Sequence, residues 1–274
     1  MKGAKLMIAE EIAGRFAGLP YVQAVVLSGS RTSRADDGHS DFDIYVYTQQ
    51  EVPPIWRLEL ARPYGSHIAV DNHYWETGDD WIDTRTGREV DIMYRSPEWI
   101  EEQLDRVLVH CEASTGYSTC FWYNVLNSQI LYDRAGWFGR LQERVNQPYP
   151  EALRRAIVAK NHPILRKTNS SYIQQLELAV ERRDLVSINH RVAALLASTF
   201  DLLFAVNHQP HPGEKRLVAY VEMLCPKRPP ELAQQVGAMI AASALPGQPE
   251  LLTCANSLLD SLDTLLMTEG HITV

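Results

Sequence analysis

The chain has 274 residues, of which 45% are hydrophobic and 22% are charged, and its formal net charge is −8. This composition excludes a disordered or low-complexity chain, and apolar stretches shorter than about 20 residues exclude a membrane-spanning helix. The acidic balance and the lack of a long basic run with interleaved aromatic residues disfavour polynucleotide binding.

The first 95 residues switch between helical and strand patterns. Residues 4–17 carry apolar side chains at helical spacing, and the pattern ends near Gly18 and Pro20, which predicts a helix. Residues 24–27 form a continuous apolar run, which is typical of a strand that is buried on both faces. This strand stops at Ser28, where a polar segment begins.

Two further strands show clean alternation. Residues 41–47 place apolar side chains on one face and polar or aromatic side chains on the other, and residues 89–94 do the same. Between them, residues 68–83 have the pattern of a hairpin that turns near Gly78. The carboxylates of these strands therefore lie on the face opposite the predicted core.

From Ser96 onward the period becomes helical. Ser96 suits an N-cap and Pro97 the first helical position, and punctuating prolines separate the helices that follow. We expect an α+β fold in which a domain with a mixed sheet, residues 1–95, precedes an all-α helical bundle, residues 96–274. The helices expected in the bundle cover residues 118–131, 151–160, 171–182, 185–206, 231–242 and 250–267.

Three fragments of the first domain carry candidate chemistry. Gly29 and Ser30 follow the first strand, where a glycine permits close backbone approach and successive N–H groups can cradle phosphate oxygens. Asp41 and Asp43 lie at i and i+2 of the second strand, roughly 7 Å apart on one face. Asp91 supplies a third carboxylate from a later strand with the same alternation.

These oxygen ligands suit Mg²⁺, which bridges protein carboxylates to substrate phosphates. Two metal ions can stabilise both the attacking and the leaving oxygen of an in-line displacement. Each fragment alone is common in strands and turns, so the prediction depends on their order and spacing together.

This order closely resembles the nucleotidyltransferase fold of the DNA polymerase β superfamily, over residues 25–94. The helical second half makes the whole chain similar to bacterial nucleotidyltransferase-domain proteins and to the aminoglycoside and lincosamide nucleotidyltransferases. The resemblance implies that Gly29 and Ser30 contact phosphate and that Asp41, Asp43 and Asp91 bind Mg²⁺, expected as two ions. It also implies a nucleoside triphosphate as substrate. The helical half matches no motif, so no ligand is transferred to it.

Basic residues add weaker candidates. Arg31, just after the Gly-Ser pair, is a candidate triphosphate contact, with a surface loop position as the alternative. The segment between residues 140 and 167 is rich in arginine and lysine and could face a polyanionic ligand, and Lys160 is its candidate phosphate contact. A solvated helix face is the alternative account of this basic segment.

We therefore predict an Mg²⁺-dependent enzyme that transfers a nucleoside monophosphate from a nucleoside triphosphate to a hydroxyl of an unidentified small-molecule or protein acceptor. One alternative is a non-catalytic, antitoxin-like partner protein. Another is a two-metal phosphodiesterase, which the scattered histidines disfavour. The four cysteines have no CxxC spacing, so we expect a reducing, cytoplasmic location. Because no apolar stretch is long enough to span a membrane, we expect no membrane partner.

Overall fold

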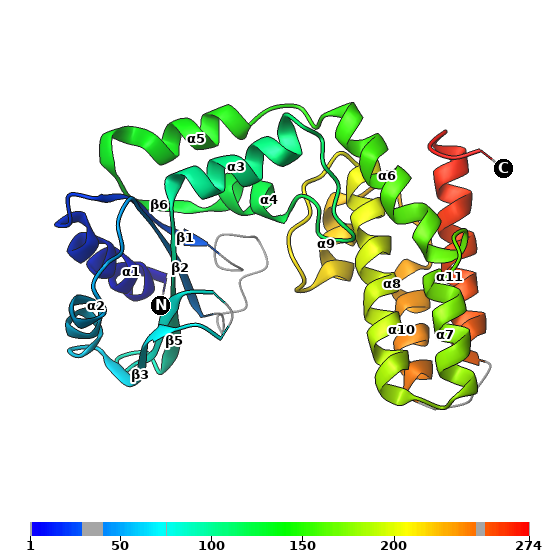
Figure 1. The fold of residues 1–274 in the computed structure, drawn as a ribbon, viewed down its shortest axis with the longest axis horizontal. Helices are drawn as coiled ribbons and strands as arrows, with labels where there is room; N and C mark the ends of the chain where they lie inside the picture. The colour runs from blue at the N-terminus through cyan, green and yellow to red at the C-terminus, as the bar shows by residue number, and fades with distance from the viewer. Residues whose placement is uncertain (1, 29–40, 75, 245–249, 274) are drawn as a thin grey trace. The chain divides into compact units, whose positions relative to one another are not determined.

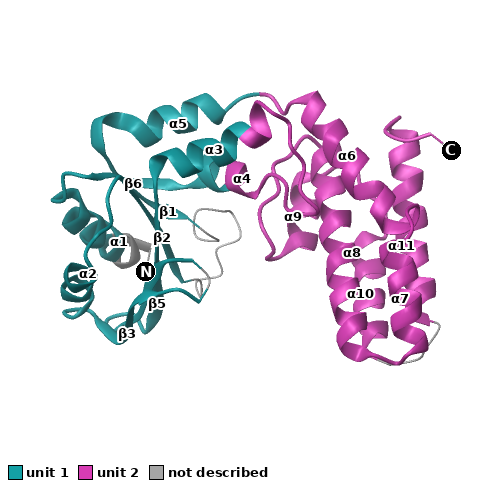
Figure 2. Ribbon diagram, viewed as in Figure 1, with its two compact units in different colours: residues 1–105, 124–147 teal, residues 106–123, 148–274 magenta. Residues whose placement is uncertain are grey.

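A computed structural model describes residues 2–28, 41–74, 76–244 and 250–273, with side chains from residue 7 onward. The chain forms two compact units, each discontinuous in sequence (Figure 2). Met1–Asp105 and Asn124–Gln147 form the first, here called the sheet unit. Arg106–Tyr123 and Pro148–Val274 form the second, here called the helical unit. The expected division at residue 95 falls inside the sheet unit, and domains 1–95 and 96–274 stay a prediction.

The sheet unit is built on a six-stranded mixed sheet with the strand order β3-β4-β5-β2-β1-β6 (Figure 1). The central strands β2 and β5 run parallel, and their other neighbours are antiparallel. The chain thus combines a mixed sheet with an all-helical unit, which confirms the expected α+β class. The strands are β1 (Val22–Ser28), β2 (Phe42–Thr48), β3 (Gly65–Asn72), β4 (Gly78–Asp83), β5 (Arg88–Arg95) and β6 (Gln129–Asp133).

Alternation along the central strands separates a core face from a polar face. Phe42, Ile44, Val90 and Ile92 are fully buried in one cluster with side chains of α1 (Lys2–Ala17) and α2 (Pro54–Ala61). On the opposite face, helix α5 (Trp137–Val145) covers the far end of β2, where Tyr47 contacts two aromatic rings of α5. Asp43 and Asp91 are left half-buried at the other end of this polar face.

Most expected elements are confirmed, and one assignment is wrong. The strands expected at residues 24–27, 41–47 and 89–94 are β1, β2 and β5, and Ser96 accepts the N–H of Trp99 (3.1 Å) as the expected cap of α3 (Pro97–Leu108). The helix expected over residues 118–131 ends early, as α4 (Cys120–Asn127), and β6 follows it. Pairing with the open edge of β1 overrides the local helical pattern there.

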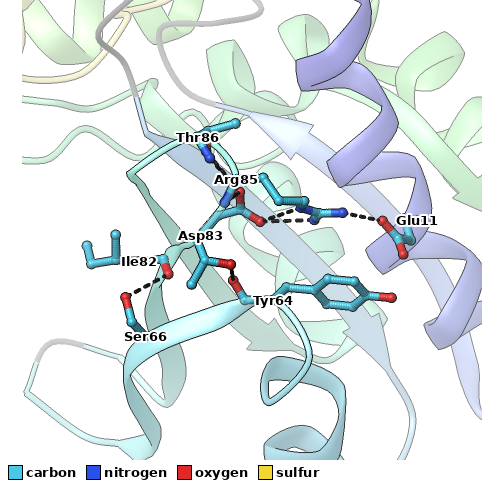
Figure 3. Close-up of polar contacts among 8 residues, drawn as sticks. Glu11, Tyr64, Ser66, Ile82, Asp83, Arg85 and Thr86 are labelled. Carbon is cyan, nitrogen blue, oxygen red and sulfur yellow. Dashed lines mark hydrogen bonds and ion pairs between the residues drawn. The ribbon is translucent and has the colours of Figure 1, made fainter.

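A buried carboxylate fixes the turn between β4 and β5 (Figure 3). Asp83 Oδ1 accepts the backbone N–H groups of Arg85 and Thr86, both at 3.0 Å. The Arg85 guanidinium spans from Asp83 Oδ2 (2.9 Å) to Glu11 Oε2 on α1 (2.8 Å). These contacts tie the start of β5 to α1 and so help to set the register in which Asp91 enters the sheet.

The helical unit packs long helices around a separate apolar core. In the described part of this unit no helix is both long and apolar enough to cross a membrane, and the same holds for the described helices of the sheet unit. The helices of the helical unit include α6 (Glu151–Arg166), α7 (Tyr172–Glu181), α8 (Leu185–Val206), α9 (Leu217–Leu224), α10 (Leu232–Ser243) and α11 (Glu250–Thr268).

Candidate functional site

Three carboxylates form a row across the centre of the sheet. Asp43 on β2 is the register partner of Asp91 on β5, and Asp91 is in turn the partner of Asp80 on β4. Register partners on neighbouring strands project their side chains from the same face of a sheet. Asp43, Asp91 and Asp80 therefore share the polar face, and all three are half-buried.

Polar side chains continue the row at both ends. Ser28, the last residue of β1, is the register partner of Asp43, and its Oγ accepts a hydrogen bond from Asn124 Nδ2 (2.6 Å). At the other end, Asn72 of β3 donates its Nδ2 to Asp80 Oδ2 (2.7 Å). Ser28 is 2% exposed, so its hydroxyl belongs to the interior of this face. The row is thus anchored by side-chain amides on either side of the carboxylates.

The surroundings of Asp91 raise the affinity of its carboxylate for protons. Burial raises the pKa of Asp91 to about 6, and the negative charges of Asp43, Glu89, Asp80 and Glu76 add to the shift. A raised pKa of this origin means that the ionised row is unfavourable without a compensating cation. The electrostatics of the row therefore favour positive charge at Asp91.

Arg95 lies on the same face as Asp91, farther along β5. Its guanidinium makes a bidentate contact with Glu76 (both Oε within 3.0 Å). The guanidinium stacks 4.2 Å from the Tyr45 ring centroid and 4.8 Å from that of Trp99. Because Arg95 is only 8% exposed and is bonded to Glu76, its guanidinium is held in place on this face.

The structure brings some of the sequence-predicted residues together and leaves others apart. Asp43 and Asp91 are adjacent, and Asp41 is exposed in the segment that leads into β2, two residues before Asp43. Gly29, Ser30 and Arg31 lie outside the described residues. Lys160 belongs to the helical unit, where it is exposed on α6.

The donor set of the row fits a hard cation. Mg²⁺ is usually bound by one or two carboxylates together with water and substrate phosphates, not by a complete protein cage. Asp43 and Asp91 provide such a pair. Among the described residues, no group of three or more His, Cys, Asp or Glu side chains is arranged to hold a metal ion by itself. The arrangement therefore suits a metal ion that arrives with phosphate ligands.

Asp80 is the member of the row that the sequence did not reveal. Asp79 and Asp80 are adjacent in a predicted hairpin, and only the register with β5 decides which of them faces Asp91. Asp79 turns to the core side, where it is 1% exposed and binds Arg57. Alternation from Trp81, which is also buried, is the one signal in the sequence that could have assigned the two faces.

Comparison with known proteins gives one partial family match and distant structural likenesses. The family model of DUF4037, a domain of unknown function, matches residues 121–217, less than half of the chain. No curated protein matches the chain.

Two of the solved structures that match the chain are distant likenesses. One is a nucleotidyltransferase-like protein from Exiguobacterium sibiricum 255-15, with 13% identity, a TM-score of 0.45 and coverage of 96% of this chain and 75% of that one. The other is the Thermotoga maritima CCA-adding enzyme complexed with tRNA, with 10% identity, a TM-score of 0.33 and coverage of 96% and 81%.

Proposed function

We propose that the chain is a nucleotidyltransferase that transfers a nucleoside monophosphate from a nucleoside triphosphate to an acceptor hydroxyl. The observation that supports this most directly is the register pairing of Asp43 with Asp91 on the half-buried polar face. The two strand carboxylates follow the order expected from the sequence resemblance and are neighbours on one face of the sheet.

In this proposal Asp41, Asp43 and Asp91 hold Mg²⁺. The bound metal would neutralise the phosphate charge and polarise the α-phosphoryl group. The carboxylates fix the position of the triphosphate, and Ser28 stands beside Asp43 at the end of β1, where Gly29 and Ser30 continue the chain as the proposed phosphate contacts. Arg31 and Lys160 are proposed as further phosphate contacts.

The reaction is an in-line displacement at the α-phosphorus. The acceptor oxygen forms the new P–O bond, the bond to the β-phosphate bridging oxygen breaks, and pyrophosphate leaves. The hydroxyl proton passes to a base or to water. Because phosphoryl transfer depends chiefly on positioning and charge neutralisation, the row can serve it without a covalent enzyme intermediate.

The test is binding of nucleoside triphosphates with and without Mg²⁺, measured by calorimetry on the wild type and on Asp43→Asn. Asparagine keeps the side-chain volume but removes a negative ligand, so we expect triphosphate affinity in Mg²⁺ to fall at least about tenfold. Asp105→Asn is the matched control, because Asp105 lies on α3 in the same unit and pairs at the surface with Arg144 (3.6 Å).

Equal affinity of Asp43→Asn and the wild type would contradict the proposal. So would triphosphate binding that is indifferent to divalent cations. If binding follows the expectation, release of pyrophosphate in the presence of candidate acceptors identifies the transfer step and the acceptor.

A further inference from the structure

The last turn of α4 lies beside the carboxylate row and makes a polar contact with its end. Asn124 Nδ2 donates a hydrogen bond to Ser28 Oγ (2.6 Å), and Ser28 is the register partner of Asp43. All three residues belong to the sheet unit. Asn124 is therefore separated by one side chain from Asp43, the carboxylate that the proposed function makes a metal ligand.

Side-chain donors fix the backbone that carries Asn124. Ser128 Oγ donates to the carbonyl of Asn124 (2.7 Å). Gln142 Nε2, on α5, donates to the carbonyls of Val125 (2.8 Å) and Ser128 (2.9 Å). Carbonyl groups at the end of a helix lack partners within the helix, so these donors hold the last turn of α4 in place. The Asn124 side chain thus meets Ser28 from a fixed position.

The amide of Asn124 is a poor choice for stability alone. A carboxamide has two N–H donors and an acceptor oxygen. Asn124 Oδ1 is buried and has no hydrogen-bond partner among the described residues. A buried acceptor without a donor lowers the free energy of unfolding, so an apolar side chain of similar size should be tolerated at least as well. The contact with Ser28 therefore points to a role other than stability.

The direction of this hydrogen bond decides where the proton of the Ser28 hydroxyl points. A hydroxyl has one donor and two acceptor lone pairs. Because Asn124 Nδ2 occupies a lone pair of Ser28 Oγ, the hydroxyl proton is directed to another acceptor. Antiparallel register partners have Cβ atoms roughly 4.5–5.5 Å apart, which brings the Asp43 carboxylate within reach of this proton. Ser28 is buried, so little water competes for it.

We propose that Asn124 is a positioning residue of the carboxylate row and acts on Asp43 through Ser28. This inference rests on the proposed nucleotidyltransferase function. Asn124 directs the Ser28 hydroxyl to one oxygen of Asp43, and this bond fixes the carboxylate and leaves its other oxygen for a metal ion. A carboxylate that is already held in place loses less conformational freedom when a metal ion and triphosphate bind, so their affinity is higher.

The experiment combines calorimetric titration of the full chain with ATP, CTP, GTP and UTP in Mg²⁺ and urea denaturation of each variant. Asn124→Leu keeps a similar volume but removes the donor, and Ser28→Ala removes the hydroxyl. We expect each variant to bind the preferred triphosphate at least about fivefold more weakly than the wild type. The double variant should be within about twofold of Asn124→Leu, because both substitutions remove the same contact. The urea midpoint of Asn124→Leu should not fall below that of the wild type.

Asn127→Leu is the matched control, because Asn127 is an exposed asparagine in the same turn of α4, and it should bind triphosphate as the wild type does. Wild-type affinity in Asn124→Leu, with a loss in Asp43→Asn, would overturn the inference and leave the proposed function standing. Weaker binding by Asn124→Leu together with a lower urea midpoint would make the role of Asn124 structural and would also overturn it.

The Ser28→Ala variant tests the intermediate step. Wild-type affinity in Ser28→Ala would contradict an action of Asn124 through the Ser28 hydroxyl. If the wild type binds none of the four triphosphates in Mg²⁺, the proposed function itself fails, and the inference fails with it.

Discussion

Asp80 accepts a hydrogen bond from the side-chain amide of Asn72 (2.7 Å). In the proposed site it adds negative charge beside Asp91 without being one of the expected metal ligands. We predict that Asp80→Asn weakens Mg²⁺-dependent triphosphate binding only about threefold, because it lowers the field at Asp91 and leaves Asp43 and Asp91 in place.

The measurement is the same calorimetric titration, with Asp43→Asn alongside. A loss in Asp80→Asn as large as that in Asp43→Asn would make Asp80 a ligand and contradict the assignment. Unchanged triphosphate affinity in Asp80→Asn would show that the charge of Asp80 does not affect binding at Asp91.

For single residues, the sequence predicts on which face of the sheet a side chain lies where strand alternation alone decides it. Asp43 and Asp91 come within that class, since each sits between two apolar residues that must face the core. Asp80 and Asn72 do not, because their contribution to the row depends on the register between strands. Asn124 does not either, because it lies on α4 and reaches Ser28 only through tertiary packing. Register is decided by long-range pairing and by turns such as the one at Asp83.

Among the elements, α2 is held to the β3–β4 hairpin by a buried arginine. Arg57 Nη1 lies 2.9 Å from Asp79 Oδ1 and Nη2 lies 2.8 Å from Asp71 Oδ1, and the Arg57 and Asp79 side chains are each 1% exposed. Asp79 also accepts the hydroxyl of Tyr94 (2.6 Å) and the backbone N–H of Asp71 (2.9 Å). This network joins one helix to three strands.

We predict that Arg57→Leu lowers the free energy of unfolding by about 3–5 kcal/mol, because it leaves the buried Asp79 carboxylate without its positive partner. Chemical denaturation followed by circular dichroism measures the loss. Arg62→Leu, at the exposed end of α2, is the control and should change stability by less than about 0.5 kcal/mol. Equal stability of the two variants would contradict the role given to Arg57.

Elements with strong internal periodicity were predictable, and those that depend on a neighbour were not. The helix α8 was expected over the residues that form it, since its apolar pattern is long and its cap, Asp184, accepts the N–H of Ser187 (3.1 Å). The short strand β6 follows α4 directly, and nothing local distinguishes its residues from a continuing helix. Its strand conformation follows from the unpaired edge of β1.

For the molecule as a whole, a buried carboxylate in the helical unit links stability to pH. Asp201 on α8 is 1% exposed and accepts hydrogen bonds from Ser118 Oγ (2.6 Å), Ser118 N (3.0 Å) and Asn161 Nδ2 (3.3 Å). Burial raises the pKa of Asp201 to about 7, although the bonds from Ser118 act in the opposite direction. These contacts fasten residues 114–118 to α6 and α8.

The sign of the effect follows from the direction of the shift. A carboxyl whose pKa is higher in the folded chain than its usual 3.8 binds its proton more tightly when folded. The contribution of Asp201 to the free energy of unfolding is therefore complete below about pH 4 and is lost as the pH rises to about 7. The loss is at most about 4 kcal/mol, since each pKa unit corresponds to about 1.4 kcal/mol.

We predict that Asp201→Asn, which cannot titrate, flattens the dependence of unfolding free energy on pH between about pH 4 and pH 7. Urea denaturation at several pH values provides the measurement. Glu181→Gln removes an exposed carboxylate at the end of α7 and should keep the wild-type profile. Parallel profiles for Asp201→Asn and the wild type would show that Asp201 has no raised pKa in the folded chain.

The pairing of β1 with β6 also affects the order in which the chain can fold as it is made. Ala24 pairs with Asp133, so the ribosome must add about 100 residues after β1 before its last neighbour exists. Until then a nascent chain that has already assembled β1 to β5 keeps the outer edge of β1 open, with its N–H and C=O groups unpaired. Such an edge can pair with another nascent chain, and the delay sets the interval in which chaperones that bind nascent chains would have to protect it.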